Sequence, residues 1–194
     1  DSGTSWAKSE HEIAWEQFLI KKGINRTPAY PEGITARRLD REDKMIFKGD
    51  EFEITLDKQT GFIENWIYKG DKILEQGPQF NIWRAPLDND AGGNPLNSSY
   101  LSRWNKKSLR EVEWKVEDIQ VTTYENFHWL VKVQGKGSAG KMKFDMEWLY
   151  RFFTNGEVEL QVMMSRNDNL PLPKVGTEIH LPKGMDQLTW YGLG

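Results

Sequence analysis

Apolar and polar residues alternate along much of this chain with a period of two. Residues 51–56 place Phe52, Ile54 and Leu56 on one face, and residues 62–68 resume the pattern after a turn at residues 57–61. Because successive side chains of a strand point to opposite faces, this alternation predicts strands with one buried face. The two segments and their turn therefore predict a β-hairpin.

The same alternation returns in the second half of the chain. Residues 135–140, which are rich in glycine, are expected to separate two strands. The segment Thr154-Asn155-Gly156 is typical of a tight hairpin turn, because an Asn-Gly pair tolerates positive φ angles. The expected strands cover residues 111–123, 127–134, 141–153, 158–164, 174–181 and 187–191.

The first 43 residues have a different character. Residues 9–20 carry apolar side chains on both faces of a predicted strand, with a short amphipathic helix as the alternative. Residues 21–43 are rich in charge, proline and glycine, so we expect a connecting segment that contains a domain boundary.

One helix is expected, at residues 99–107. Ser98 or Ser99 is suited to cap it, and Leu101, Trp104 and Leu109 are expected to dock on a sheet. Many short strands separated by turns, with so little helix, indicate an all-β protein built as a large antiparallel β-sandwich.

Composition excludes several kinds of site. The chain has 194 residues, a net charge of −3 and no cysteine, so disulfides, thiolate nucleophiles and cysteine-bound zinc are excluded. The acidic balance argues against nucleic acid as a partner, and no apolar stretch is long enough to predict a membrane span. His11, His128 and His180 lie too far apart in sequence for metal-ligand spacing, and no metal site is expected.

The segment FNIWRAPLDNDAG, residues 80–92, concentrates polar chemistry. Arg84, Asp88, Asn89 and Asp90 follow one another closely, and Asp and Asn side chains bond their own backbone in rigid loops. The Arg84 guanidinium is suited to fork onto one of these carboxylates or onto a partner domain. Such a loop can shape a binding site, or it can be an ordinary surface turn. A pair of acid/base carboxylates or a Ca²⁺ site at Asp88 and Asp90 is a further alternative.

Two further features are candidates for function. Gly92 precedes a second glycine and is the candidate hinge of a loop that continues through Asn94. Trp190 and Tyr191 alternate on a predicted strand, so one ring faces the core and the other faces outwards. An exposed aromatic ring can stack on a sugar, whereas the alternative for both rings is packing in the core or at an interface.

Three segments together resemble one enzyme family. FNIWRAPLDNDAG, the final LTWYGLG and the initial TSWAKSEHEIAWEQF are similar, in this order, to segments of the large bacterial β-galactosidases of glycoside hydrolase family 2. The resemblance implies that residues 1–20 are the last strand of an immunoglobulin-like domain and that residues 21–43 are a linker. It implies that residues 44–194 are the first part of the C-terminal sandwich, a partial galactose-mutarotase-like supersandwich.

The resemblance also implies an activity. Family members hydrolyse terminal non-reducing β-D-galactose residues by a retaining mechanism that uses two glutamates of a (β/α)8 barrel. No alternation of strands and helices predicts a barrel here, so no catalytic residue is expected in this chain and the chain alone is expected to be inactive. Any Mg²⁺ or Na⁺ of the intact enzyme is expected to bind elsewhere, with no cofactor in this chain.

By the same resemblance, a loop lines the substrate cleft and can close over bound sugar. It comprises Arg84, Asp88, Asn89, Asp90, Gly92 and Asn94. The expected partners are the remaining β-galactosidase domains, a β-galactoside and further copies of the protein in a homo-oligomer, in the bacterial cytoplasm or periplasm. Two alternatives stay open: a free-standing carbohydrate-binding sandwich and a purely structural interaction module.

Overall fold

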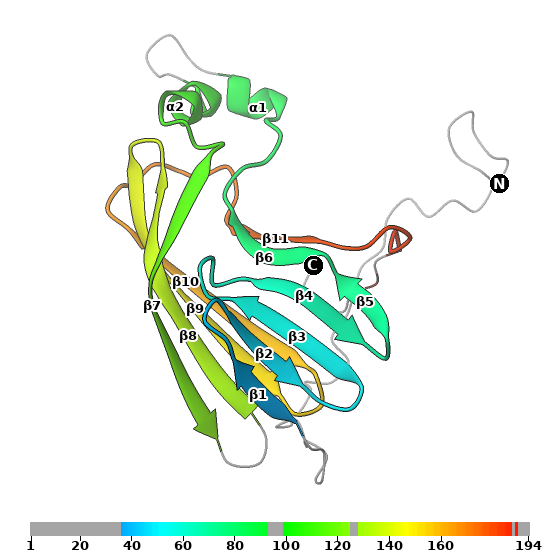
Figure 1. Ribbon diagram of the computed structural model, residues 1–194. Coiled ribbons are helices and arrows are strands. Elements are labelled where there is room, and N and C mark those ends of the chain that lie inside the picture. Colours follow the sequence, from blue (N-terminus) through cyan, green and yellow to red (C-terminus); the bar gives the residue numbers. More distant parts are fainter. Residues whose placement is uncertain (1–35, 93–98, 125–127, 188, 190–194) are drawn as a thin grey trace, which may run out of the picture.

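A computed structural model describes residues 36–92, 99–124, 128–187 and 189, and within them the protein is an all-β antiparallel sandwich (Figure 1). The described residues form three antiparallel sheets and two short helices. The strands are β1 Arg37–Asp40, β2 Lys44–Lys48, β3 Phe52–Asp57, β4 Ile63–Tyr68, β5 Asp71–Leu74, β6 Gln76–Asn81, β7 Val112–Tyr124, β8 His128–Ala139, β9 Met142–Phe153, β10 Val158–Arg166 and β11 Gly176–His180. The helices are α1 Asp88–Ala91 and α2 Tyr100–Lys106.

Local sequence explains the first sheet, in which β1 to β5 pair in chain order. The hairpin of β3 and β4 confirms the prediction from residues 51–68, and Gly61 takes a positive φ of 71° in its turn. The sheet begins at Arg37, inside the predicted connecting segment, because Arg37–Asp40 pairs with β2 along its whole length. Tertiary pairing thus makes a strand from residues whose charge predicts a connection.

The second sheet consists of long hairpins in the order β10-β9-β8-β7. The alternating pattern after residue 110 is confirmed, since the valines and tryptophan of β7 are half-buried and the charged residues between them are exposed. The Asn155-Gly156 turn is also confirmed, with Gly156 at a φ of 87°.

The prediction of a loop at residues 135–140 is wrong. Strand β8 continues through Gly135 and Gly137 to Ala139, and β9 pairs with it along this stretch. The glycines are required by packing, since a Cβ on Gly137 would lie 2.0 Å from the Phe144 ring. A Cβ on Gly135 would lie 2.2 Å from the Lys115 carbonyl oxygen and 2.7 Å from the Trp114 ring, so neighbouring backbone and aromatic rings occupy the space that the glycines leave.

The core lies between these two sheets and is rich in aromatic rings. Phe47 of β2 stacks on Phe152 of β9, with ring centroids 3.9 Å apart, and also contacts Trp129 of β8. Trp148 and Phe152, like Phe47, are fully buried. Burial of one such ring stabilises the fold by about 2–3 kcal/mol, so these contacts hold the sheets together.

A third, two-stranded sheet pairs segments that are far apart in the sequence. Strand β6 pairs with β11, so that Phe80 lies opposite Thr177 and Asn81 opposite Gly176. Figure 1 shows this ribbon running towards the end of the molecule that carries both helices. The pairing is not predictable from alternation, because neither strand has a clear polar face and almost 100 residues separate them.

The single predicted helix is confirmed as α2. Ser99 is its N-cap, and the Ser99 hydroxyl accepts a hydrogen bond of 3.1 Å from the Ser102 backbone amide. Trp104 and Leu109 are buried, whereas Leu101 is half-buried. The last predicted strand, residues 187–191, lies largely outside the described residues, as does the whole of residues 9–20. In the part of the chain that the structure describes, no helix is long and apolar enough to cross a membrane.

Candidate functional site

The candidate site begins where the chain leaves β6. Ile82 is fully buried and anchors the segment, and the Asn81 side chain accepts a hydrogen bond of 2.7 Å from the Trp83 backbone amide. The chain then turns through Pro86 into the single-turn helix α1, which packs beside α2 at one end of the sandwich (Figure 1). The sequence did not predict α1, since four residues are too few to show a helical period.

Arg84 and Asp90 form a two-pronged ion pair. The Arg84 Nη1 lies 2.7 Å from Asp90 Oδ2, and Nη2 lies 3.0 Å from Asp90 Oδ1. Asp90 Oδ2 also accepts a hydrogen bond of 2.7 Å from the Leu87 backbone amide, and Asp90 is only 7% exposed. The fork of Arg84 onto a nearby carboxylate is therefore confirmed, and this Arg84–Asp90 clamp closes the loop on itself.

The clamp shifts the pKa of both groups away from its ordinary value. The Arg84 guanidinium and the Leu87 amide lower the pKa of Asp90 below its usual value, and the Asp90 carboxylate raises the pKa of Arg84. Asp90 therefore stays ionised near neutral pH. Both Asp90 oxygens bond to Arg84, which disfavours Asp90 as one member of an acid/base pair or as a Ca²⁺ ligand. The alternative of an acid/base pair or Ca²⁺ site at Asp88 and Asp90 stays a prediction.

Arg84 also ties the loop to the connection between β10 and β11. Its Nε donates to the Pro173 carbonyl at 2.8 Å, and Nη1 donates to the Ala85 carbonyl at 3.0 Å. Trp104 of α2 donates from Nε1 to the Pro171 carbonyl at 2.7 Å. One arginine and one tryptophan thus hold α1, α2 and this connection together.

Trp83 and Trp104 are residues of this site that sequence reasoning missed. Their rings meet edge to face at a centroid distance of 6.2 Å, and Arg84 lies 5.6 Å from the Trp104 ring. Trp83 lies beside Arg84 inside the motif, but an isolated tryptophan is usually a core residue. The contact of Trp83 with Trp104 becomes visible only because the structure packs α2 against the loop.

Asp88 and Asn89 are the polar residues of the motif that stay exposed. Neither side chain bonds to any other residue in the described ranges, and Leu87 beside them is 62% exposed. The loop therefore presents a carboxylate, an amide and an apolar side chain, while the Arg84–Asp90 clamp holds its backbone.

The remaining predicted site residues are less constrained. Gly92 has a φ of −65° and a ψ of 140°, which any residue can adopt, and a Cβ there would meet nothing closer than 3.6 Å. The conformation at Gly92 therefore does not require glycine. Asn94, Trp190 and Tyr191 lie outside the described residues.

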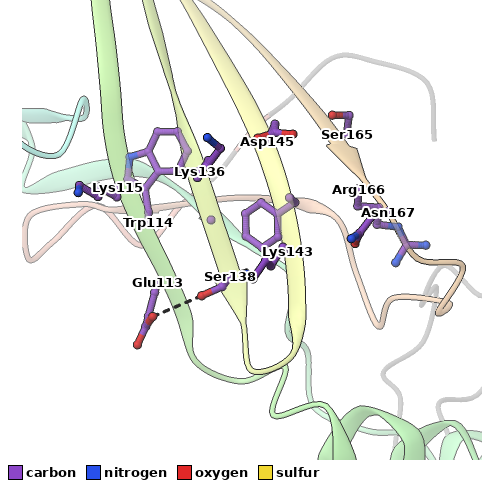
Figure 2. A pocket seen from close by; sticks show the side chains of 12 residues that line it. Glu113, Trp114, Lys115, Lys136, Ser138, Lys143, Asp145, Ser165, Arg166 and Asn167 are labelled. Carbon is purple, nitrogen blue, oxygen red and sulfur yellow. Dashed lines mark hydrogen bonds between the residues drawn. The ribbon is translucent and has the colours of Figure 1, made fainter.

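A separate groove of about 860 Å³ crosses the four-stranded sheet (Figure 2). Glu113 and Ser138 point toward one another there, and the Ser138 hydroxyl donates to Glu113 at 3.3 Å. Lys136 pairs with Glu117 at 3.0 Å, which raises the Lys136 pKa. Within the described ranges, no cluster of three or more His, Cys, Asp or Glu residues could hold a metal ion.

Comparison with known proteins gives one family and many relatives. The family model described as beta galactosidase small chain matches residues 48–194. The β-galactosidase of Psychromonas ingrahamii is 30% identical over 202 residues, covering 97% of this chain and 19% of that protein. The β-galactosidase of Vibrio cholerae is 27% identical over 194 residues, with 97% and 19% covered. That of Lactococcus lactis is 28% identical over 194 residues, with 96% and 19% covered.

The coverage is as informative as the identity. Nearly the whole chain aligns, but it spans only about 19% of the length of these curated relatives. Each of them therefore contains other domains in addition to the region that corresponds to this chain.

Proposed function

Because the chain belongs to the β-galactosidase small-chain family, we propose that it is the non-catalytic sandwich of a β-galactosidase that hydrolyses terminal β-D-galactose residues. In this proposal the catalytic glutamates belong to domains outside the chain, as do any Mg²⁺ and Na⁺ ions. The chain supports that active site and contributes one loop to its rim. The breadth of the match and the small share of each relative that it covers support this division of labour.

The observation that carries the role of the loop is the Arg84–Asp90 clamp. In this clamp the buried Asp90 carboxylate holds the loop, and Asp88 and Asn89 stay exposed with no side-chain hydrogen bond to another described residue. Carboxylate and amide groups held on a rigid loop suit the recognition of sugar hydroxyls, because little entropy is lost when they bind. Arg84 and Asp90 are accordingly positioning residues, whereas Asp88 and Asn89 are proposed to meet the substrate.

The test is steady-state kinetics of the full-length enzyme. Asp88→Ala and Asn89→Ala are each expected to lower kcat/KM about tenfold, the effect of one lost hydrogen bond to a charged or well-placed group. Glu42→Ala, which removes an exposed carboxylate from the turn before β2, is the matched control and should leave kcat/KM unchanged. Unchanged kinetics in both loop variants would overturn the role of the loop.

The isolated chain provides a second test. It is expected to hydrolyse no chromogenic galactoside, because the proposal assigns both catalytic glutamates to domains outside this chain. Turnover by purified chain at a rate near that of an intact β-galactosidase would contradict the proposal.

A second candidate function is carbohydrate binding by the sandwich itself. A cleft of about 790 Å³ lies between β4 and the β9–β10 hairpin, lined by Trp66, Tyr68, Asn155 and Glu157. Its size is typical of ligand sites, and aromatic rings beside amide and carboxylate groups suit a sugar. Titration with galactose or lactose, followed by tryptophan fluorescence, is expected to give a saturable change that Tyr68→Ala abolishes if this function holds.

A further inference from the structure

Five cations gather at the C-terminal end of α2. Arg103 and Lys106 lie in its last turn, and Lys107 is its C-cap. A Cβ on Gly140 would lie 2.0 Å from the Lys107 carbonyl oxygen, so the β8–β9 turn, which carries Lys141, abuts this helix end. We call Arg103, Lys106, Lys107, Arg110 and Lys141 the basic surface.

Two aromatic rings hold the arginines of this surface. The Arg103 guanidinium lies 4.5 Å from the centroid of the Tyr100 ring, and the Arg110 guanidinium lies 4.7 Å from that of Trp83. A guanidinium held over a ring keeps its planar set of donors in one place. The arginines are therefore prepared to bind a carboxylate with less loss of side-chain entropy.

The basic surface lacks an anionic partner within the described part of the chain. None of its five cations forms an ion pair there, although ten ion pairs of Lys or Arg with Asp or Glu occur elsewhere in the described residues. The helix dipole favours Arg103 and Lys106, which lie in the last turn of α2. Arg103 and Lys107 are four residues apart and repel each other. This concentration of charge, in a chain of net charge −3, is thus not explained by its own contacts.

We propose that the basic surface docks onto an acidic surface of another domain of the full-length protein. This proposal rests on the proposed function, in which the chain works beside domains outside it. The surface lies next to α1, since α1 and α2 contact each other, and so it borders the loop proposed to face those domains. The relatives, of which the chain spans about 19%, contain enough additional protein to supply such a partner.

The direct test is chemical labelling of lysines in the full-length protein. Lys106, Lys107 and Lys141 are expected to acetylate about tenfold more slowly than Lys72 and Lys183, because a docked ammonium group reacts only from the minor undocked population. Lys72 and Lys183 are the controls, being exposed and without an ion pair to another described residue. Zero-length carbodiimide cross-linking should join the three lysines to Asp or Glu residues outside this chain.

Charge reversal separates docking from catalysis. Lys106→Glu combined with Arg110→Glu should abolish the cross-links and the protection, whereas Lys72→Glu combined with Lys183→Glu should not. Equal acetylation of all five lysines would overturn the proposal. So would a second result: desalting removes the protection from the wild-type protein, and inorganic phosphate alone restores it. Normal cross-links with unchanged kinetics in both Asp88→Ala and Asn89→Ala would leave docking intact and overturn only the role of the loop.

Discussion

Asp88 and Asp90 have the same side chain two residues apart but different surroundings. Asp90 is buried against Arg84 and the Leu87 amide, whereas Asp88 is exposed. The sequence grouped them because it contains no information on which carboxylate meets the arginine. The structure separates them into one carboxylate that organises the loop and one that is exposed and forms no hydrogen bond to another described residue.

Asp90 should make stability depend on acid. The pKa of Asp90 is lowered in the folded protein. Its contribution to the free energy of unfolding is therefore present above the unfolded-state pKa of about 3.9 and is lost as pH falls through the folded-state pKa. Asp90→Asn is expected to be less stable than wild type at pH 7 and to lose less stability on acidification. Urea unfolding between pH 7 and pH 3 measures both effects, with Asp88→Asn as the control that should follow wild type.

Tyr150 should make stability depend on alkali. Its hydroxyl is buried and has no hydrogen-bond partner among the described residues, and this burial raises its pKa. Tyr150 ionises more readily in the unfolded chain than in the folded protein. Its contribution to the free energy of unfolding is therefore complete below the unfolded-state pKa of about 10 and is lost as pH rises above it. Tyr150→Phe should match or exceed wild-type stability by about 1 kcal/mol at pH 7, since it removes an unsatisfied buried hydroxyl.

The measurement for Tyr150 is thermal unfolding from pH 7 to pH 11. Tyr150→Phe is expected to lose less stability above pH 10 than wild type. Tyr124→Phe, which alters an exposed tyrosine, is the control. Identical alkaline profiles of Tyr150→Phe and wild type would contradict the prediction.

At the scale of elements, α2 depends on its N-cap. Ser99→Ala removes the acceptor of the Ser102 amide and is expected to destabilise the protein by about 1 kcal/mol. Ser99→Asp retains an acceptor at this position and should restore most of the loss. Urea unfolding of the two variants provides the comparison, and equal stability of Ser99→Ala and wild type would show that the cap contributes nothing.

The β8–β9 hairpin depends on glycines within a strand. Gly137→Ala is expected to cost about 1–3 kcal/mol, because its Cβ would overlap the Phe144 ring. Gly92→Ala, whose Cβ meets nothing closer than 3.6 Å, should change stability by less than about 0.5 kcal/mol. Chemical denaturation distinguishes them. If Gly92→Ala also preserves kcat and KM in the full-length enzyme, the hinge proposed at Gly92 does not operate.

At the scale of the whole molecule, apolar side chains remain uncovered along and after β11. Val175, Ile179, Leu181 and Met185 are each more than 40% exposed. Such a group on an edge strand invites another chain, as the expectation of a partly built sandwich implies. We expect the isolated chain to self-associate at high concentration. Ile179→Lys should weaken this association, as measured by light scattering. Asn105→Lys on α2 adds the same charge and is the control. A wild-type chain that stays monomeric at all concentrations would contradict the expected self-association.

The sequence by itself determined what depends on near neighbours. Period-two alternation predicted the β3–β4 hairpin, the Asn155-Gly156 turn and the all-β class, since side-chain direction and turn angles are local properties. Ser99 and its helix were predictable for the same reason. The pairing of Arg84 with a carboxylate was also predictable from near neighbours, because both candidate aspartates follow within six residues.

Only the tertiary structure decided the rest. It paired β6 with β11, kept Gly135 and Gly137 inside a strand and brought Trp104 and Pro173 to Arg84. It also chose Asp90 over Asp88 and gathered Lys141 with the cations of α2. Each of these outcomes joins residues that are distant in sequence or compete for one partner, and their free energy depends on packing in three dimensions rather than on local conformation.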